Sequence, residues 1–269
     1  MKERILTGLA IAGLGFLLVL YLPTPFFILL STIIVLWLAW EWSGLLGLKS
    51  LWAKLAYVVL LGFSLLASFH LPIWPVLVVA TIFWCLALCM VVLYPRATVV
   101  WCHHWIARAV VGLLALVPCW LSVNVIHTAT DGPIALVLLI LLVSMADSGA
   151  YFAGRFWGRT PLMPNVSPKK TWEGAVGGLL SALVVVVILG LVMHLDFEQW
   201  ITMLVLAVVV VSFSIVGDLL ESVLKRQAGV KDSGNLLPGH GGLLDRVDSL
   251  LAAAPLFLAA RLLTKHLGL

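Results

Sequence analysis

Long apolar runs, separated by short clusters of polar residues, proline and glycine, constrain this 269-residue chain more than any other feature. A helix needs about 20 apolar residues to cross the hydrocarbon core of a bilayer. Divided at those clusters, the sequence predicts nine spans, at 5–22, 24–41, 51–70, 73–94, 106–126, 133–154, 174–194, 200–221 and 249–266. Composition supports them, because 63% of the residues are hydrophobic and only 10% are charged. We therefore expect an all-α polytopic membrane protein that forms a single integral domain over 1–269.

The lysines and arginines indicate how these spans are oriented. With the N-terminus in the cytoplasm, every Lys and Arg except Arg261 and Lys265 falls on the cytoplasmic side, as basic residues of membrane proteins tend to do. The MKER start before an apolar stretch could also belong to a secretory signal, but the stretch ends in YLPTP without a small-x-small cleavage pattern. We expect it to remain as the first span, 5–22.

The acidic residues are distributed unevenly along the chain. Apart from Glu3 and Glu41, the acids on the predicted cytoplasmic side fall between Asp147 and Asp248. One face of the C-terminal half, 131–269, therefore holds nearly all of the unusual polarity. We expect the catalytic site in that half, with 1–130 supplying N-terminal helices.

The stretch MADSGAYFAGRFWGR places Asp147 about two turns inside the cytoplasmic end of span 133–154. An acid at that depth is costly and usually faces a polar interior. Asp147 is therefore a candidate site residue, although an ion pair with Arg155 would also account for it.

The stretch NVSPKKTWEGAVGG places Lys169 and Lys170 just before span 174–194. Free backbone N–H groups and the helix dipole favour anions at a helix N-terminus, so two ammonium groups there would suit a phosphate. Anchoring to anionic lipid explains the same two lysines equally well. The stretch alone leaves both interpretations open.

The stretch VGDLLESVLKR spaces Asp218, Glu221, Ser222 and Lys225 so that they share one helix face. A polar stripe at the inner end of a transmembrane helix must face protein, water or a bound ion. A surface pair between Glu221 and Lys225 would be simpler, but it explains neither Asp218 nor its depth.

The stretch LLPGHGGLLDRVDSLL sets Asp245 and Asp248 three residues apart at the start of span 249–266. Two carboxylates that point the same way repel unless a proton, a lysine or a metal lies between them. Mg²⁺ commonly uses one or two carboxylates with phosphate oxygens and water. Asp245 and Asp248 with Asp218 would therefore form an acidic metal site, although a single acid there could simply complement the helix dipole.

The glycines before those acids, Gly239, Gly241 and Gly242, allow a backbone to approach a ligand closely, although any turn uses glycine. Carboxylates for a metal, basic residues for phosphate and one cytoplasm-facing cavity together indicate phosphoryl-type chemistry. We expect it to act on a lipid at the inner leaflet, with a charged co-substrate from the cytosol.

The run from Ser222 to Asp248, SVLKRQAGVKDSGNLLPGHGGLLDRVD, closely resembles the signature of the phosphatidate cytidylyltransferases, also called CDP-diacylglycerol synthases. SPKKTWEG upstream and the GD pair at 217–218 are also similar to this family, and the length and nine spans fit its bacterial members. The resemblance implies that phosphatidic acid and CTP react to give CDP-diacylglycerol and pyrophosphate. It also implies Mg²⁺, with room for a second cation, a homodimer without nucleic acid, and the bacterial inner membrane with the active site facing the cytoplasm.

The resemblance also assigns roles to individual residues. The implied metal ligands are Asp218, Asp245 and Asp248. The implied catalytic residues are Asp218, Lys225, Arg226, Asp245, Arg246 and Asp248. The implied substrate-binding residues are Asp147, Ser167, Lys169, Lys170, Thr171, Glu173, Ser222, Lys231, Asp232, Gly239, His240, Gly241 and Gly242.

Other classes fit the sequence less well. A CDP-alcohol phosphotransferase needs D-x2-D-G-x2-A-R followed by G-x3-D-x3-D, and the chain has neither. A transporter or proton channel predicts charges throughout the membrane depth, whereas these gather at one face. A structural membrane scaffold would not need a polar loop with this order of residues.

Overall fold

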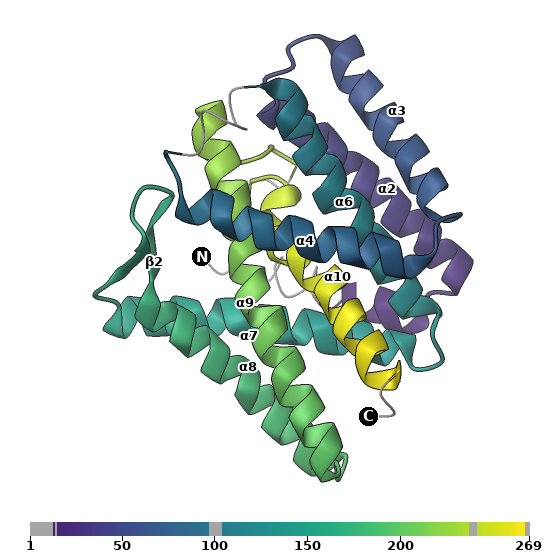
Figure 1. Ribbon diagram of the computed structural model, residues 1–269, viewed down its shortest axis with the longest axis vertical. Helices are drawn as coiled ribbons and strands as arrows, with labels where there is room; N and C mark the ends of the chain where they lie inside the picture. The colour runs from purple at the N-terminus through teal and green to yellow at the C-terminus, as the bar shows by residue number, and fades with distance from the viewer. Residues whose placement is uncertain (1–12, 14, 97–103, 237–240, 267–269) are drawn as a thin grey trace.

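The computed structural model describes residues 13, 15–96, 104–236 and 241–266, and these residues form an almost entirely helical protein (Figure 1). The N-terminal helices are α2 (Thr24–Leu45), α3 (Leu51–Ser68), α4 (Ile73–Val92) and α6 (Trp105–Thr128). The C-terminal helices are α7 (Gly132–Trp157), α8 (Trp172–Val192), α9 (Phe197–Ala228) and α10 (Leu244–His266). These eight helices are long and apolar enough to cross a membrane, which confirms the predicted all-α membrane architecture.

Eight of the predicted spans coincide with these eight helices; half of span 5–22 lies outside the described residues, and its described stretch 15–21 is helical. The largest differences are at the polar ends. Helix α9 continues seven residues past 221 because ESVLKRQA contains good helix formers, and it ends at Gly229, whose φ of 69° is left-handed. Helix α10 starts at Leu244, so Asp245 and Asp248 belong to its first turns.

A short antiparallel hairpin, β1 (Pro161–Met163) and β2 (Ser167–Thr171), connects α7 to α8. In its register Pro161 lies opposite Thr171 and Met163 lies opposite Ser167. No strand was predicted here from the sequence. The hairpin projects from the helices at one side of the molecule (Figure 1).

Small residues bring α7 and α8 together. A Cβ added at Gly149 of α7 would lie 1.9 Å from Oγ of Ser181 and 2.7 Å from the backbone oxygen of Gly177, both on α8. Transmembrane helices often pack through such small residues, since neighbouring helices gain little from the hydrophobic effect in lipid.

Helices α9 and α10 also approach closely, at the end of α9 that carries the polar stripe. A Cβ at Gly217 would lie 2.5 Å from the backbone oxygen of Asp248. Only glycine therefore lets Asp218, the next residue, come this close to the first turns of α10.

Polar contacts fix the end of α2 against α6. The guanidinium of Arg108 donates to the backbone oxygens of Leu45 and Leu46 at 2.8 and 3.1 Å, which satisfies carbonyl groups that a helix end leaves unpaired. In return, Nε1 of Trp42 donates to the backbone oxygen of Arg108 at 3.1 Å. Trp42 is 1% exposed, so this end of α2 is held inside the core.

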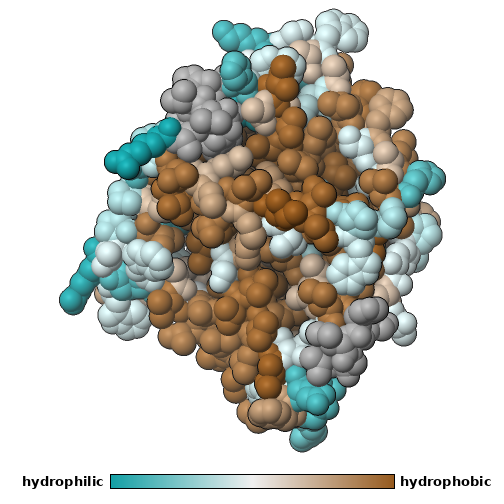
Figure 2. Space-filling model, viewed as in Figure 1, coloured by the Kyte–Doolittle hydropathy of each residue, from teal (hydrophilic) through white to brown (hydrophobic). Residues whose placement is uncertain are grey.

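The visible outer surface is that of a membrane protein. Hydrophobic residues cover the middle of the face in Figure 2, over α4, α8 and α9, and hydrophilic residues gather at its margins. Large apolar side chains are exposed on helices at this surface, among them Val78 on α4, Leu180 on α8 and Val205 on α9. Such a surface is stable in lipid rather than in water.

Candidate active site

Helix α9 is longer than a membrane crossing requires, and its polar stripe lies near the C-terminal end of this helix. At 1.5 Å per residue its 32 residues extend about 48 Å, against about 30 Å of hydrocarbon. Counted from Phe197, about 20 residues reach Val216. Asp218 and the charged residues after it therefore follow a stretch that is by itself long enough to cross the hydrocarbon.

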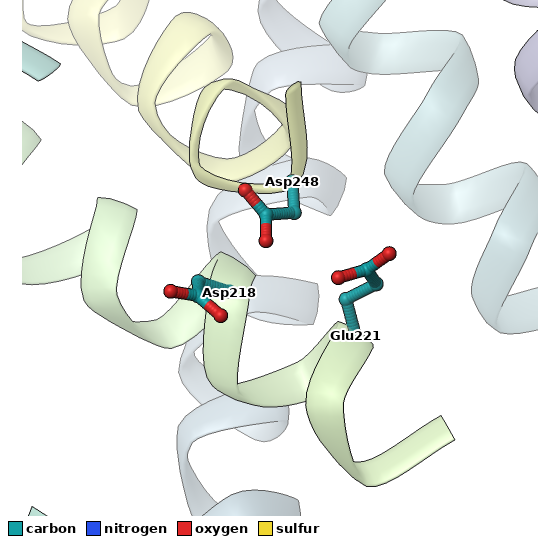
Figure 3. Close-up of side chains that lie close together, drawn as sticks. All are labelled: Asp218, Glu221 and Asp248. Carbon is teal, nitrogen blue, oxygen red and sulfur yellow. The ribbon is translucent and has the colours of Figure 1, made fainter. Parts of the chain in front are cut away.

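Three carboxylates form an acidic cluster between α9 and α10 (Figure 3). Asp218 and Glu221 project from α9 and Asp248 projects from α10, and one oxygen of each lies within 4.8 Å of the others. Glu221 is only 1% exposed, and within the described structure its Oε1 is buried without a hydrogen-bond partner. An unpaired buried carboxylate oxygen is unfavourable, and oxygen ligands are those that Mg²⁺ prefers.

Lysines neutralise part of this negative charge. Lys170, on β2, pairs with Oδ2 of Asp218. Lys225 pairs with Glu221 and Asp245, with Nζ 2.6 Å from an oxygen of each. When ionised, the acidic cluster and Asp245 together exceed these two ammonium groups by two negative charges, which a divalent cation would balance.

Asp245, a metal ligand in the sequence analysis, makes other contacts in the structure. Its Oδ2 accepts hydrogen bonds from the backbone N–H and Oγ of Ser233 and from the backbone N–H of Gly242, all at 2.9 Å. Its Oδ1 accepts a hydrogen bond from Nζ of Lys225. Asp245 thus ties α10 to the preceding loop, and Glu221 takes its place in the acidic cluster.

A cavity of about 390 Å³ opens beside Asp218, between α7, α8, α9 and the hairpin. Asp147, Lys169, Lys170 and Asp218 all contribute to its wall. The rest of the wall is mostly small or apolar, formed by Ala146, Ala150, Tyr151, Gly154, Arg155, Leu162, Thr171, Gly174, Ala175, Gly178, Val211, Ser214 and Ile215. Residues from three of the four predicted stretches therefore meet in one cavity.

Two predicted substrate-binding residues support the start of α8. Oγ1 of Thr171 accepts from the backbone N–H of Gly174 at 3.1 Å and so caps the helix. The carboxylate of Glu173 accepts from the backbone N–H groups of Arg159 and Thr160 at 3.1 and 3.2 Å. Both side chains thereby position the hairpin that carries Lys169 and Lys170.

The remaining predicted residues lie around this centre. Oγ of Ser222 lies 3.4 Å from Oδ1 of Asp218, and Nε of Arg226 donates to the backbone oxygen of Val166 at 3.3 Å. Ser167 lies on β2, Arg246 lies on α10, and Lys231, Asp232, Gly241 and Gly242 belong to the α9–α10 connection. Gly239 and His240 lie outside the described residues.

Glu41 was not predicted as a site residue, yet it lies against the start of α10 in the structure. Glu41 lies on α2, is 5% exposed, and accepts hydrogen bonds from the backbone at the start of α10. A single acid at the end of the apolar stretch 24–41 was the signal available in the sequence.

Comparisons with known proteins identify the family to which the chain is similar. Residues 2–263 match the model of the cytidylyltransferase family. The chain is 40% identical to a phosphatidate cytidylyltransferase of Pseudomonas aeruginosa over 264 residues, covering 96% of both chains. It is 35% identical to a phosphatidate cytidylyltransferase of Haemophilus influenzae, over 96% of this chain and 97% of the relative. A Bacillus subtilis protein of the same name is 48% identical over 115 residues, 43% of this chain and 42% of the relative.

Proposed function

The chain belongs to the cytidylyltransferase family, and we propose that it transfers the cytidylyl group of CTP to phosphatidate, giving CDP-diacylglycerol and pyrophosphate. The names of two relatives are the strongest support for this proposal. Two relatives that each match over 96% of this chain are both named phosphatidate cytidylyltransferase.

The position of the site suits one lipid substrate and one soluble substrate. The acidic cluster lies at the membrane boundary of α9. The cavity beside it has an apolar wall that bears Lys169 and Lys170. Such a wall would accept the diacylglycerol part of phosphatidate and place two cations beside its phosphate.

Asp218, Glu221 and Asp248 would hold Mg²⁺, because they offer three carboxylates and one unpaired buried oxygen. When bound, Mg²⁺ would neutralise charge on the triphosphate of CTP. Asp245 remains a further candidate ligand, one turn before Asp248, and a second cation is part of the same proposal.

The transfer itself needs no covalent intermediate on the protein. An oxygen of the phosphatidate phosphate attacks the α-phosphorus of CTP, and a new phosphorus–oxygen bond forms. The bond from the α-phosphorus to the oxygen that bridges to the β-phosphorus breaks, and pyrophosphate leaves with that oxygen. The protein contributes by positioning the two phosphates and neutralising charge, as in other phosphoryl transfers.

Basic residues near the start of α10 would bind the nucleotide phosphates. Lys225 is fixed between two carboxylates, while Arg226, Lys231 and Arg246 are exposed. Their charges would hold the triphosphate of CTP and then the departing pyrophosphate. His240 is proposed for the same role from its place in the sequence motif.

We place this site on the cytoplasmic face of the bacterial inner membrane. The concentration of lysine and arginine on the side that holds the N-terminus supports this orientation, and CTP is a cytosolic nucleotide. The homodimer and the absence of a nucleic-acid partner follow from the family resemblance alone.

The proposal is tested with the purified chain in detergent, phosphatidate and CTP labelled at the α-phosphate. We expect labelled CDP-diacylglycerol in the presence of Mg²⁺, none in excess chelator, and recovery when Mg²⁺ is restored. Absence of this product, while a known phosphatidate cytidylyltransferase forms it in the same detergent, would refute the proposed function.

A further inference from the structure

Glu41 of α2 caps α10 from a distant part of the sequence. Its Oε1 accepts from the backbone N–H of Leu243 at 3.0 Å, and its Oε2 accepts from the backbone N–H of Leu244 at 2.7 Å. The first N–H groups of a helix have no partner within it and usually bind a side chain of the preceding residue. Here that residue is Leu243, whose side chain has no acceptor, so the cap comes from another helix.

The same carboxylate also holds the loop before α10. Oγ of Ser233 lies 3.3 Å from Oε2 of Glu41 and 2.9 Å from Oδ2 of Asp245. Nε1 of Trp37, one turn earlier on α2, donates to Oε1 at 3.1 Å. Three N–H donors, and a Ser233 hydroxyl shared with Asp245, thus surround a buried carboxylate, which makes its burial tolerable without a paired cation.

Two glycines of the loop make room for Glu41. A Cβ at Gly234 would lie 2.7 Å from Oε1, and a Cβ at Gly242 would lie 2.7 Å from Oε2. A larger residue at either position would displace the carboxylate of Glu41. Glu41 therefore accounts for the glycine at 234, and together with Ser233 and the backbone of Gly234 it accounts for the glycine at 242.

We propose that Glu41 is a positioning residue for the transfer reaction, and this inference rests on the proposed function. It fixes the first turn of α10, and with it Asp245 against Lys225 and Asp248 against the acidic cluster of α9. The hydrogen bond from Nε1 of Trp42 to the backbone oxygen of Arg108 holds this end of α2 against α6, so the position of Glu41 is fixed as well. Displacing a reacting group by about 1 Å can cost 100-fold in rate.

The experiment compares Glu41→Gln with two controls in the purified full chain. Glutamine keeps the shape but has only one acceptor oxygen, so it cannot cap both Leu243 and Leu244. Trp37→Phe removes one donor to Glu41 and leaves both backbone contacts. Glu198→Gln neutralises an exposed acid at the opposite end of α9.

In Glu41→Gln we expect kcat per folded protein to fall about 10- to 100-fold, with the KM for phosphatidate unchanged. Hydrogen–deuterium exchange in peptides covering 241–248 should become about tenfold faster or more, while exchange in 205–215 stays the same. Both controls should resemble the wild type. The split between kcat and KM distinguishes positioning from a general loss of stability.

The inference is overturned if kcat per folded Glu41→Gln protein equals that of the wild type, or if Trp37→Phe is equally damaging. It is also overturned if the backbone amides of Leu243 and Leu244 exchange rapidly in the wild type. This measurement uses the wild type alone, so it can be made even if no Glu41 variant folds. Hydrogen–deuterium exchange can be measured without catalytic turnover. A wild-type chain that forms no CDP-diacylglycerol would therefore refute the proposed function separately from these contacts.

Discussion

Nζ of Lys225 lies 2.6 Å from Oδ1 of Asp245, and this ion pair joins the end of α9 to the first turn of α10. The same ammonium lies 2.6 Å from Oε2 of Glu221. The side chains of Lys225, Glu221 and Asp245 are 14%, 1% and 9% exposed. One shielded cation therefore stabilises two carboxylates on different helices.

Replacement of Lys225 by methionine should destabilise the protein as well as inactivate it. Glu221 and Asp245 would remain buried without their cation, a change that typically costs about 3–5 kcal/mol. Thermal unfolding in detergent measures the loss. The double variant Lys225→Met/Glu221→Gln should regain part of the stability but no activity, and a double variant as unstable as the single one would contradict this account.

Asp248→Asn should lower turnover by about two orders of magnitude and raise the Mg²⁺ concentration for half-maximal rate. The amide keeps the shape of Asp248 but removes one charge from the acidic cluster. Helical content should stay the same by circular dichroism. Asp196→Asn is the matched control, because asparagine caps the start of α9 as well as aspartate does. Near-normal turnover in Asp248→Asn would remove Asp248 from the metal site.

Gly217→Ala should separate α9 from α10. The new methyl group would lie 2.5 Å from the backbone oxygen of Asp248, and such overpacking costs about 1–3 kcal/mol. Turnover should fall further than stability alone explains, because Asp218 moves with residue 217. In Gly44→Ala of α2 the methyl group meets nothing within 4 Å, so that control should keep wild-type stability and rate.

The two lysines of the hairpin should differ in their effects. Lys170 pairs with Asp218, whereas Lys169 is exposed at the cavity. Lys170→Met should therefore lower kcat, and Lys169→Met should mainly raise the KM for phosphatidate. Steady-state rates at several phosphatidate contents of a mixed micelle separate the two. If both lysines only anchor the chain to anionic lipid, added phosphatidylglycerol will restore both variants.

The orientation of the chain is tested by labelling. A cysteine at Lys231, in the α9–α10 connection, should react with a membrane-impermeant maleimide in inverted vesicles and not in intact spheroplasts. A cysteine at Glu198, at the other end of α9, should show the opposite pattern. The wild-type chain supplies the background from its native cysteines. Labelling of residue 231 from outside alone would reverse the proposed topology.

Hydrophobicity and local spacing were sufficient to predict the membrane helices and the polar stripe of α9. Both depend on neighbouring residues, since a run of about 20 apolar residues can satisfy its backbone in lipid only as a helix. The shared face of Asp218 and Glu221 follows from the helical repeat alone. The hairpin at 161–171 was not predicted, because its strands are three and five residues long and alternate little.

The partners of the acids could not be predicted in the same way. Asp245 and Asp248 cannot be distinguished in the sequence. In the folded chain Asp245 pairs with Lys225, whereas Asp248 belongs to the acidic cluster. Glu41 lies 202 residues before Leu243, so no local pattern relates the two. Contacts across such separations depend on how α2, α9 and α10 pack.

The excess length of α9 also determines how the two substrates are supplied. With the acidic cluster at the membrane boundary, phosphatidate arrives by lateral diffusion in two dimensions and CTP arrives by diffusion in three. The rate of the enzyme therefore depends on the mole fraction of phosphatidate in the bilayer and on the molarity of CTP in the cytosol. Diluting the membrane with inert lipid would slow the reaction even when the amounts of enzyme, phosphatidate and CTP stay constant.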